Sequence, residues 1–406
     1  MTTELTEVPR IAIPFHKPEF LADPYPVFDA IVDAGPIHYD EHIGQYVVAG
    51  YLQCARILGD PLTFDSDKVL LEKVMGGVTM EAMDNPRHDQ VKGIWAPAFR
   101  RRGLESCSQM ISEIVAQSVD PYVERLRDGD IADAITGMTR AIPTTVIATM
   151  LGIPTDDVPQ FTAWSDTAVN LIEGYTDHSP AGAAKVAAGE AATNALNDYL
   201  RSRVASRRAQ AGSDASDLVG QMVHHQVAAT MTEREIVASN AQLVLAGNET
   251  TAKLMSLTLI ALAMHPDQRA LLVRDRTLIP AAIEEVNRWH SVINALWRFV
   301  KPASASVAGV ELPAGSSIMC LLGGANRDPS RWENARAFDI TRPELGHLGF
   351  GFGLHSCLGI NLSRLETRIW LDRLLDHLPE WELAGEPVFG SNWGMRGPSL
   401  LPLAAA

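Results

Sequence analysis

Cysteine is scarce in this chain, and its few copies lie far apart. Only four of the 406 residues are cysteines, at positions 54, 107, 320 and 357. They form no CxxC pair, and they lie too far apart to indicate a zinc knuckle or a disulfide framework. Cys357 alone stands in a glycine-rich polar loop, whereas the segments around the other three are typical of small core or helix-surface residues. Cys357 is therefore the one cysteine expected to carry chemistry.

Positive charge is in deficit as well. The chain has 34 basic and 49 acidic side chains, a formal net charge of −15. Nucleic-acid binding requires a basic footprint for the phosphates, so no nucleic-acid partner is expected. With 46% apolar and 20% charged residues, the composition is that of an ordinary globular chain with a large core. These proportions favour small-molecule chemistry.

Long apolar runs are also missing. The stretch from Met1 to Phe20 has no apolar region of the signal-peptide kind, and the most apolar helix candidate, Leu254 to Met264, is too short to cross a bilayer. We expect a cytoplasmic protein without membrane contact.

The apolar periodicity predicts a mainly helical protein with a small β-rich lobe. Helical patterns dominate from Pro86 to Asp275, and a last helix is expected near 359–377. Thr232 and Glu235 form a capping box, and the helix that they open runs to His265. About thirty residues make a helix of roughly 50 Å, long enough to cross a domain and to lie against a cofactor. Short strands are predicted at 37–39, 45–49, 296–300, 307–312 and 317–322.

The loop from Phe350 to Gly359 reads Phe-Gly-Phe-Gly-Leu-His-Ser-Cys-Leu-Gly. Its glycines let the backbone curl close beneath a flat macrocycle, because they carry no Cβ. A helix that begins just after Cys357 would direct its positive end at the sulfur and stabilise a thiolate. The alternative interpretation is an ordinary buried cysteine in a glycine turn.

A second group of small and polar residues interrupts the long helix at 246–251, Ala-Gly-Asn-Glu-Thr-Thr. Ala246 and Gly247 leave room for a ligand, and Thr250 lies on the same face one turn later. A hydroxyl that holds oxygen and a carboxylate, Glu249, that relays protons suit the activation of dioxygen. The alternative is structural: Thr250 bonds back to the Ala246 carbonyl and Glu249 is a solvated charge.

These motifs, in this order, resemble those of the cytochrome P-450 family. Phe350, Gly353, Cys357 and Gly359 fill every fixed position of its haem-binding signature, Phe-x-x-Gly-x-x-x-Cys-x-Gly. The segment 246–251 is similar to its Ala/Gly-Gly-x-Asp/Glu-Thr-Thr motif. The resemblance spans nearly all of residues 1–406. It implies a single haem domain with the cytochrome P-450 fold and no fused reductase.

The resemblance also implies a structural pair and a set of haem contacts. Glu285 and Arg288, which meet across one helical turn, are similar to the family's Glu-x-x-Arg, with Arg336 or Arg342 as its third member. Haem b is the expected cofactor, with the Cys357 thiolate as iron ligand. Burial of two propionates requires several cations. The expected haem-contacting residues are His88, Lys92, Arg298, His355, Cys357, Gly359, Ala246 and Gly247.

The activity implied is insertion of one atom of O2 into a small, mainly apolar organic substrate, by hydroxylation, O-dealkylation or epoxidation. Electrons are expected from NAD(P)H through a separate ferredoxin reductase and a ferredoxin, which could dock by charge steering on Arg100, Arg101 and Arg102. The expected pocket residues are Val78, Leu243, Ala246, Gly247, Val292, Ala295, Leu296 and Met395, together with Trp393. The alternatives are a peroxide-driven or other haem-thiolate enzyme, a haem or ligand carrier, and a helical protein without haem.

Overall fold

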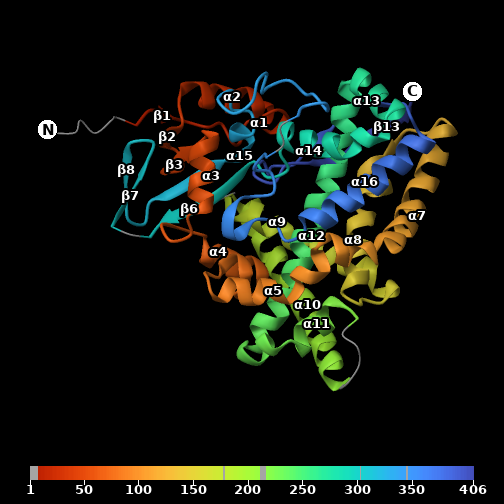
Figure 1. The fold of residues 1–406 in the computed structure, drawn as a ribbon, viewed down its shortest axis with the longest axis horizontal. Coiled ribbons are helices and arrows are strands. Elements are labelled where there is room, and N and C mark those ends of the chain that lie inside the picture. Colours follow the sequence, from red (N-terminus) through yellow and green to blue (C-terminus); the bar gives the residue numbers. More distant parts are fainter. Residues whose placement is uncertain (1–7, 177–178, 211–215, 302, 344–345) are drawn as a thin grey trace.

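The computed structural model describes residues 8–176, 179–210, 216–301, 303–343 and 346–406. It is mainly helical, with a smaller β-rich region beside the N-terminal segment (Figure 1). The fold class predicted from the periodicity is therefore confirmed. The α-helices are α1 (Pro18–Ala22), α2 (Tyr25–Ala34), α3 (Tyr51–Gly59), α4 (Lys68–Met75), α5 (Arg87–Phe99), α6 (Arg101–Glu105), α7 (Ser108–Arg127), α8 (Ala141–Met150), α9 (Val158–Thr176), α10 (Pro180–Ala209), α11 (Leu218–His224), α12 (Glu233–Met264), α13 (Pro266–Arg274), α14 (Ile279–Trp289), α15 (Leu322–Ala325) and α16 (Ile360–His377). Short 3-10 segments occupy Met80–Ala82, Thr155–Asp157, Gln226–Thr230, Arg276–Leu278 and Gly353–His355, and Ile135–Thr139 is π-helical.

The β-rich region joins parts of the chain that are far apart in sequence. Its largest sheet has the order β1-β2-β3-β9-β6-β4, in which the hairpin β2–β3 pairs in parallel with β9. The expected strand at 307–312 is instead the hairpin β7–β8, because Ala308 and Gly309 adopt φ values of 51° and 83° at its turn. The strands are β1 (Arg10–Ile11), β2 (Ile37–Asp40), β3 (Gln45–Val48), β4 (Phe64–Asp65), β5 (Ala132–Asp133), β6 (Ala295–Val300), β7 (Ser304–Val307), β8 (Val310–Pro313), β9 (Ser317–Leu321), β10 (Trp381–Leu383), β11 (Val388–Phe389), β12 (Pro398–Leu400) and β13 (Pro402–Ala405).

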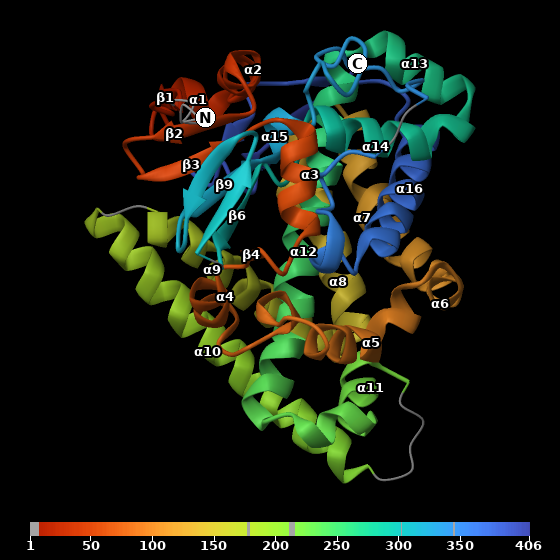
Figure 2. The same ribbon diagram turned by 60° about the vertical axis from the view of Figure 1, so that its left-hand side comes forward.

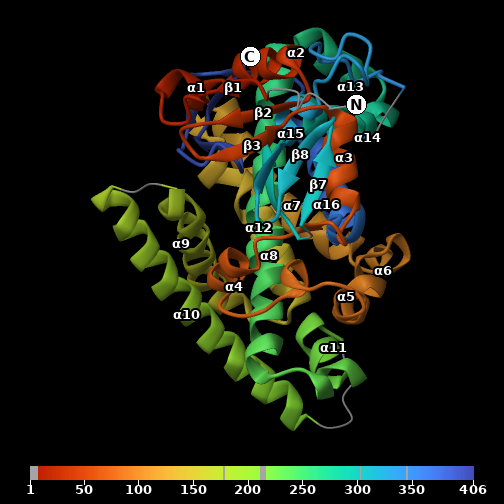
Figure 3. The same ribbon diagram turned by 90° about the vertical axis from the view of Figure 1, so that its left-hand side faces the viewer.

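Helix α12 is the axis of the helical part, as Figure 3 shows. The expected capping box is present, since the Thr232 hydroxyl accepts from the Glu235 N–H and the Glu235 carboxylate accepts from the Thr232 N–H. The helix is 32 residues long and buried over most of its length, in contact with α8, α10, α14 and α16. Burial of a Leu, Val or Ile side chain is worth about 1.5–3 kcal/mol. Packing therefore holds α12 in place through the centre of the fold.

Helix α16 begins directly after the cysteine loop and packs along α7. Its inner face carries Trp370, Leu371, Leu374 and Leu375, all of them buried, and the Trp370 Nε1–H contacts Met138 Sδ at 3.2 Å. The 3-10 turn Gly353–His355 of the cysteine loop contacts α3. Among the described residues, no helix combines the length and the apolar character that a membrane span requires.

Candidate functional site

The cysteine loop is a tight turn that only glycine can form at two positions. Gly351 and Gly353 have φ values of 71° and 74°, in the left-handed region that favours glycine. A Cβ at Gly353 would lie 2.6 Å from the Leu58 carbonyl oxygen. The Cys357 N–H donates to the Phe350 carbonyl at 2.9 Å and closes the loop. The glycines identified in the sequence therefore fix the backbone that presents the sulfur.

The Cys357 sulfur is accessible although protein surrounds it. The side chain is exposed, yet desolvation raises the pKa of its thiol. The backbone N–H of Gly359 and the cations of Lys92 and Arg364 act in the opposite direction and favour the thiolate. A side chain that is both accessible and desolvated faces a space inside the fold rather than bulk water.

Helix α12 borders an accessible space at its middle. Ala246 is exposed, and Gly247, Glu249 and Thr250 are partly exposed, although the helix on either side of them is buried. The Thr251 hydroxyl donates to Ser363 Oγ at 3.1 Å and ties this part of α12 to the first turn of α16. The exposed stretch of α12 therefore lies close to the helix that starts at the cysteine loop.

Four groups that can carry positive charge converge beside the loop. The Lys92 ammonium donates to the carbonyls of Leu354 and Ser356 at 3.2 and 3.0 Å, and the His88 and His355 rings lie 4.9 Å apart. Desolvation, followed by the charges of Arg298, His88 and Lys92, lowers the pKa of His355 to about 4. Arg298 itself is buried in β6.

This cluster fits a dianionic ligand. Within the described part of the chain, His355 Nδ1 is buried and has no hydrogen-bond partner. In this cluster burial and the neighbouring positive charges disfavour the charged forms of the histidines, and an anion beside them would restore those charges, since charged hydrogen bonds to carboxylates are the strong ones. A haem held through Cys357 would bring two propionates, which are carboxylate anions of this kind. The residues present therefore fit the group that the sequence motifs imply.

The acid and the hydroxyl of the α12 motif each have a partner. The Thr250 hydroxyl donates to the Ala246 carbonyl at 2.8 Å, the back bond expected of the structural interpretation, and its oxygen keeps lone pairs that can accept a hydrogen bond. Glu249 pairs with Lys253 at 2.5 Å and is partly buried, not a solvated surface charge. The motif thus has a structural bond and a chemically available carboxylate at once.

Glu285 and Arg288 hold the chain that leads into the cysteine loop. Both are buried, and their ion pair is bidentate, with N–O distances of 2.7 and 2.8 Å. Arg288 also donates to the carbonyls of Asn326, Ala335 and Ala337 at 2.6 to 2.9 Å. A pair of this kind is common on surfaces, but here it fixes three backbone groups in the interior.

Arg342 is the third member of this network. Its Nε lies 3.3 Å from Glu285 Oε2, and the side chain is almost buried. Arg336 instead pairs with Asp29 and Asp33 at the surface. The sequence left both arginines open, because the stretch 335–338, Ala-Arg-Ala-Phe, has its arginine displaced from the place it takes in the family's Pro-x-Arg-Phe.

The expected pocket residues are brought together only in part. Leu243 and Val292 are buried in the main core, and Val78 and Met395 pack against the same core. Leu296 is two residues from Arg298 in β6, so both side chains point to the same face of the sheet.

Ala295 and Trp393 pack with the apolar side chains of the N-terminal segment. Ala295 alternates with Leu296 in β6 and packs in a separate cluster with Phe28. Trp393 stacks on Phe15, with ring centroids 4.5 Å apart. Both side chains therefore pack in a different cluster from Leu243 and Val292, and their contribution to the pocket stays a prediction.

Two polar residues beside the site were not expected from the sequence. Desolvation raises the pKa of Glu81, while the neighbouring Gln242 amide and Arg298 act to lower it. Gln242 is fully buried, and neither of its amide atoms has hydrogen-bond geometry with a described residue. Its position one turn before Ala246 was the available clue. Glu81 lies in a segment with methionines at 75, 80 and 83, where nothing in the sequence signals a single acid near the site.

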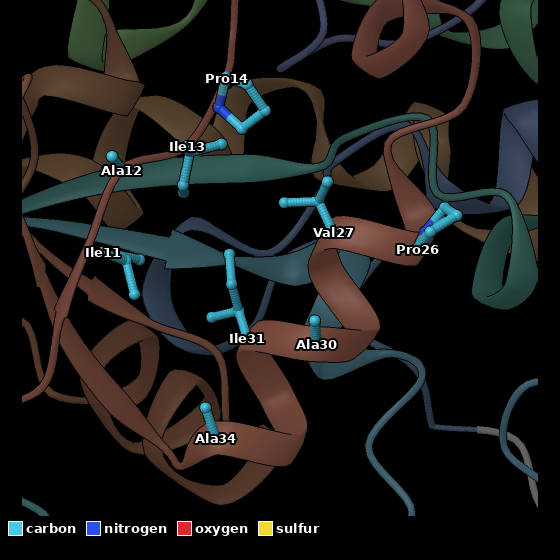
Figure 4. Close-up of a pocket in the computed structure, with 9 residues that line it drawn as sticks. All are labelled: Ile11, Ala12, Ile13, Pro14, Pro26, Val27, Ala30, Ile31 and Ala34. Atoms are coloured by element: carbon cyan, nitrogen blue, oxygen red, sulfur yellow. The ribbon is translucent and has the colours of Figure 1, made fainter.

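A separate groove lies between the segment 11–14 and helix α2 (Figure 4). Its volume is about 510 Å³. The lining residues are all apolar: Ile11, Ala12, Ile13, Pro14, Pro26, Val27, Ala30, Ile31 and Ala34. With no polar or titratable side chain in its lining, this groove offers no chemistry, and the candidate site is the one at Cys357.

Comparisons with known proteins agree with this geometry. The family model described as Cytochrome P450 matches residues 63–385. The cytochrome P450 monooxygenase PikC of Streptomyces venezuelae is 33% identical over 402 residues, 95% of this chain and 92% of PikC. The vitamin D3 dihydroxylase of Streptomyces griseolus is 32% identical over 364 residues, which cover 86% of this chain and 85% of that protein.

A solved structure shows the same architecture. P450BioI, in complex with an acyl carrier protein ligated to hexadec-9Z-enoic acid, superposes with a TM-score of 0.85 at 28% identity. The superposition covers 96% of this chain and 99% of that protein. The chain therefore belongs to the cytochrome P450 family, and it is a monooxygenase of that family.

Proposed function

We propose that this protein is a haem-thiolate monooxygenase in which Cys357 ligates the iron and His88, Lys92, Arg298 and His355 hold the propionates. One observation carries the proposal: an accessible, desolvated sulfur stands beside four converging cation-forming side chains. Such a site is costly without a ligand that is both metallic and dianionic.

When bound, haem supplies the iron chemistry by which one atom of O2 enters a substrate bond and the other leaves as water, with the uptake of two electrons and two protons. The chain supplies the protons and their geometry. Glu249 is a carboxylate that can take a proton from the solvent side and release it toward the site. The Thr250 oxygen can accept a hydrogen bond from the group that carries this proton, while the Thr250 O–H still donates to the Ala246 carbonyl. Gly247 adds no side chain to the accessible stretch of α12.

The substrate class follows from the lining. Leu243, Val292, Leu296 and Val78 present apolar surface, and Met395 adapts to shape. We propose a small, mainly apolar organic substrate that is hydroxylated, O-dealkylated or epoxidised. Glu81 and Gln242 add polar positions at one side, which favour a substrate with a hydrogen-bond donor there.

A ferredoxin that takes its electrons from NAD(P)H through a reductase is the proposed electron donor. Arg100, Arg101 and Arg102 are exposed at the junction of α5 and α6. The Asn361 amide in α16 donates to the Phe99 carbonyl at 3.1 Å, which places this junction beside the start of α16 (Figure 2). In a chain of net charge −15, such a patch near the sulfur suits an acidic partner.

The test compares product formation with a ferredoxin system and with hydrogen peroxide. A terpenoid, a steroid, an aromatic hydrocarbon and a fatty acid are first screened by the spin-state shift of the haem. The best binder is then incubated with NADPH, a plant-type ferredoxin and its reductase, or with hydrogen peroxide alone. We expect oxygenated product mainly with the ferredoxin system. Equal or faster product formation with peroxide would favour a peroxide-driven enzyme instead.

A further inference from the structure

The side chain of Lys253 joins two parts of the molecule. Its ammonium lies 2.5 Å from Glu249 Oε1 and donates to the Met395 carbonyl at 2.8 Å. Its aliphatic part passes Gly397, where a Cβ would overlap the Lys253 side chain. Lys253 therefore touches both the α12 acid and the C-terminal turn of residues 392–397.

This C-terminal turn is fixed to the pocket wall by several bonds. The Arg396 N–H donates to the Val292 carbonyl at 2.7 Å, and the Asn294 N–H donates to the Gly394 carbonyl at 2.8 Å. Met395 forms an isolated β-bridge with Ile293. A shift of residues 292–294 would therefore move the Met395 carbonyl that Lys253 holds.

Few other charges face Glu249. On α9, Asp166 is close enough for the Glu249 charge to act on it, and Arg140, at the start of α8, pairs with Asp166 at 3.4 Å. Lys253 is thus the cation in ion-pair contact with Glu249 among the described residues. One Glu249 oxygen, Oε2, is buried and has no hydrogen-bond partner within the described chain. Lys253 thus holds one carboxylate oxygen, and the other is a buried acceptor without a partner in the described chain, which can bond a water or a ligand group.

We propose that Lys253 is a positioning residue that holds Glu249 for proton delivery and ties its position to the C-terminal turn on the pocket wall. The inference rests on the proposed role of Glu249. Lys253 does not touch the reacting atoms itself; it acts through the carboxylate. A glycine is required at 397 because any Cβ there would overlap the aliphatic part of the Lys253 side chain.

The test uses the haem-loaded protein with NADPH, a plant-type ferredoxin and its reductase, without organic substrate, so that NADPH oxidation reports proton-dependent turnover. The variants are Lys253→Met, which keeps the length, Lys253→Arg, which restores the cation, Glu249→Gln, and the double variant. Two readouts are independent of turnover: the Kd of 4-phenylimidazole from the Soret shift, and crystal structures of each variant. The rate of the first electron transfer, trapped by carbon monoxide, is measured for all of them.

We expect Lys253→Met to slow NADPH oxidation by about fivefold, a modest share of what general acid catalysis supplies, and to enlarge the solvent deuterium effect. Its Kd for 4-phenylimidazole should stay within about twofold and its first electron transfer should be unchanged, because the haem contacts are intact. Lys253→Arg should recover most of the rate, and Lys253→Met should add nothing in the Glu249→Gln background. In crystals of Lys253→Met, the Glu249 carboxylate should leave its position.

Gly397→Ala tests the tie to the turn separately. The new methyl group should displace the Lys253 ammonium from the Met395 carbonyl and slow oxidation by about twofold while the charge stays. The proposal is overturned by an unchanged or faster rate in Lys253→Met, by an additive effect in the double variant, or by a displaced lysine without a change in rate. Failure of the proposed function is distinct: the wild-type protein would then lack the thiolate spectrum under carbon monoxide.

Discussion

Arg342 and Arg336 form a matched pair that tests whether the buried network supports the cysteine loop. Both are arginines of the segment before the loop, and both take part in ion pairs. Arg342 lies in the interior against Glu285, whereas the side chain of Arg336 is 45% exposed. Replacing each by alanine removes the same atoms from two different environments.

The expected costs differ. Arg342→Ala removes one charged contact to Glu285 and the donors to the carbonyls of Glu333, Asn334 and Ala337 at 2.6, 3.2 and 3.2 Å. Hydrogen bonds to charged groups contribute about 1.5–3 kcal/mol each, and exposed carbonyls regain water. Because Glu285 keeps Arg288, we expect a loss of about 2–3 kcal/mol in the free energy of unfolding. For Arg336→Ala the surface-pair value of about 0–1 kcal/mol applies.

The assay is urea unfolding of the haem-loaded proteins, followed by circular dichroism and by the Soret band. The difference in midpoint, multiplied by the shared slope, gives the difference in stability. We also expect the thiolate form of the Soret band to decay faster in Arg342→Ala, since its lost contacts precede Cys357 in the chain. A loss in Arg336→Ala equal to or larger than that in Arg342→Ala would refute this reasoning.

Three further predictions concern pH, electron delivery and coupling. Desolvation acts to raise the pKa of Glu284, but His347 and Arg364 beside it lower that pKa to about 2. Because the pKa of an unfolded glutamate is about 4.3, the ionised Glu284 contributes its full share of folding stability above that pH, and this contribution is lost as the pH falls toward 2. The stability difference between wild type and Arg364→Met should therefore be largest near pH 6 and shrink toward pH 2, as urea unfolding would show; a constant difference would contradict the assignment. Neutralising Arg100, Arg101 and Arg102 to glutamine should slow reduction by ferredoxin at least about threefold at low salt and less at high salt, with an unchanged substrate Kd; stopped-flow rates equal to wild type would exclude this docking surface. Thr250→Ala should raise peroxide release per NADPH by about tenfold at the expense of product; coupled product equal to wild type would favour a carrier or another enzyme class.

The sequence was most informative where a single residue type is required by geometry. The glycines at 351 and 353 have positive φ values, as a tight loop beneath a flat ligand requires, and Thr232 with Glu235 does cap the long helix. The break in the apolar face of that helix at Ala246 coincides with the stretch that the fold leaves accessible. Local rules of backbone conformation and periodicity are sufficient for such features.

Features that depend on side-chain direction or on distant segments were beyond the sequence. Ala295 and Leu296 differ by one residue in a strand and pack in different clusters, which the apolar pattern of the sequence does not distinguish. The partners of Lys253 are a residue four positions before it and a carbonyl 142 positions after it. The first follows from helical spacing, and the second follows only from the packing of the C-terminal turn on α12.

The central claim is that Cys357 supplies a thiolate to the iron, and the absorption spectrum of the reduced protein under carbon monoxide tests it most directly. A thiolate ligand shifts the Soret band strongly to the red of the band given by a histidine-ligated or unligated haem. We predict this red-shifted band for the wild-type protein and for a Cys107→Ala control, and its complete loss in Cys357→Ala with haem still bound. A wild-type spectrum without the shift, or a shifted band that survives in Cys357→Ala, would contradict the account.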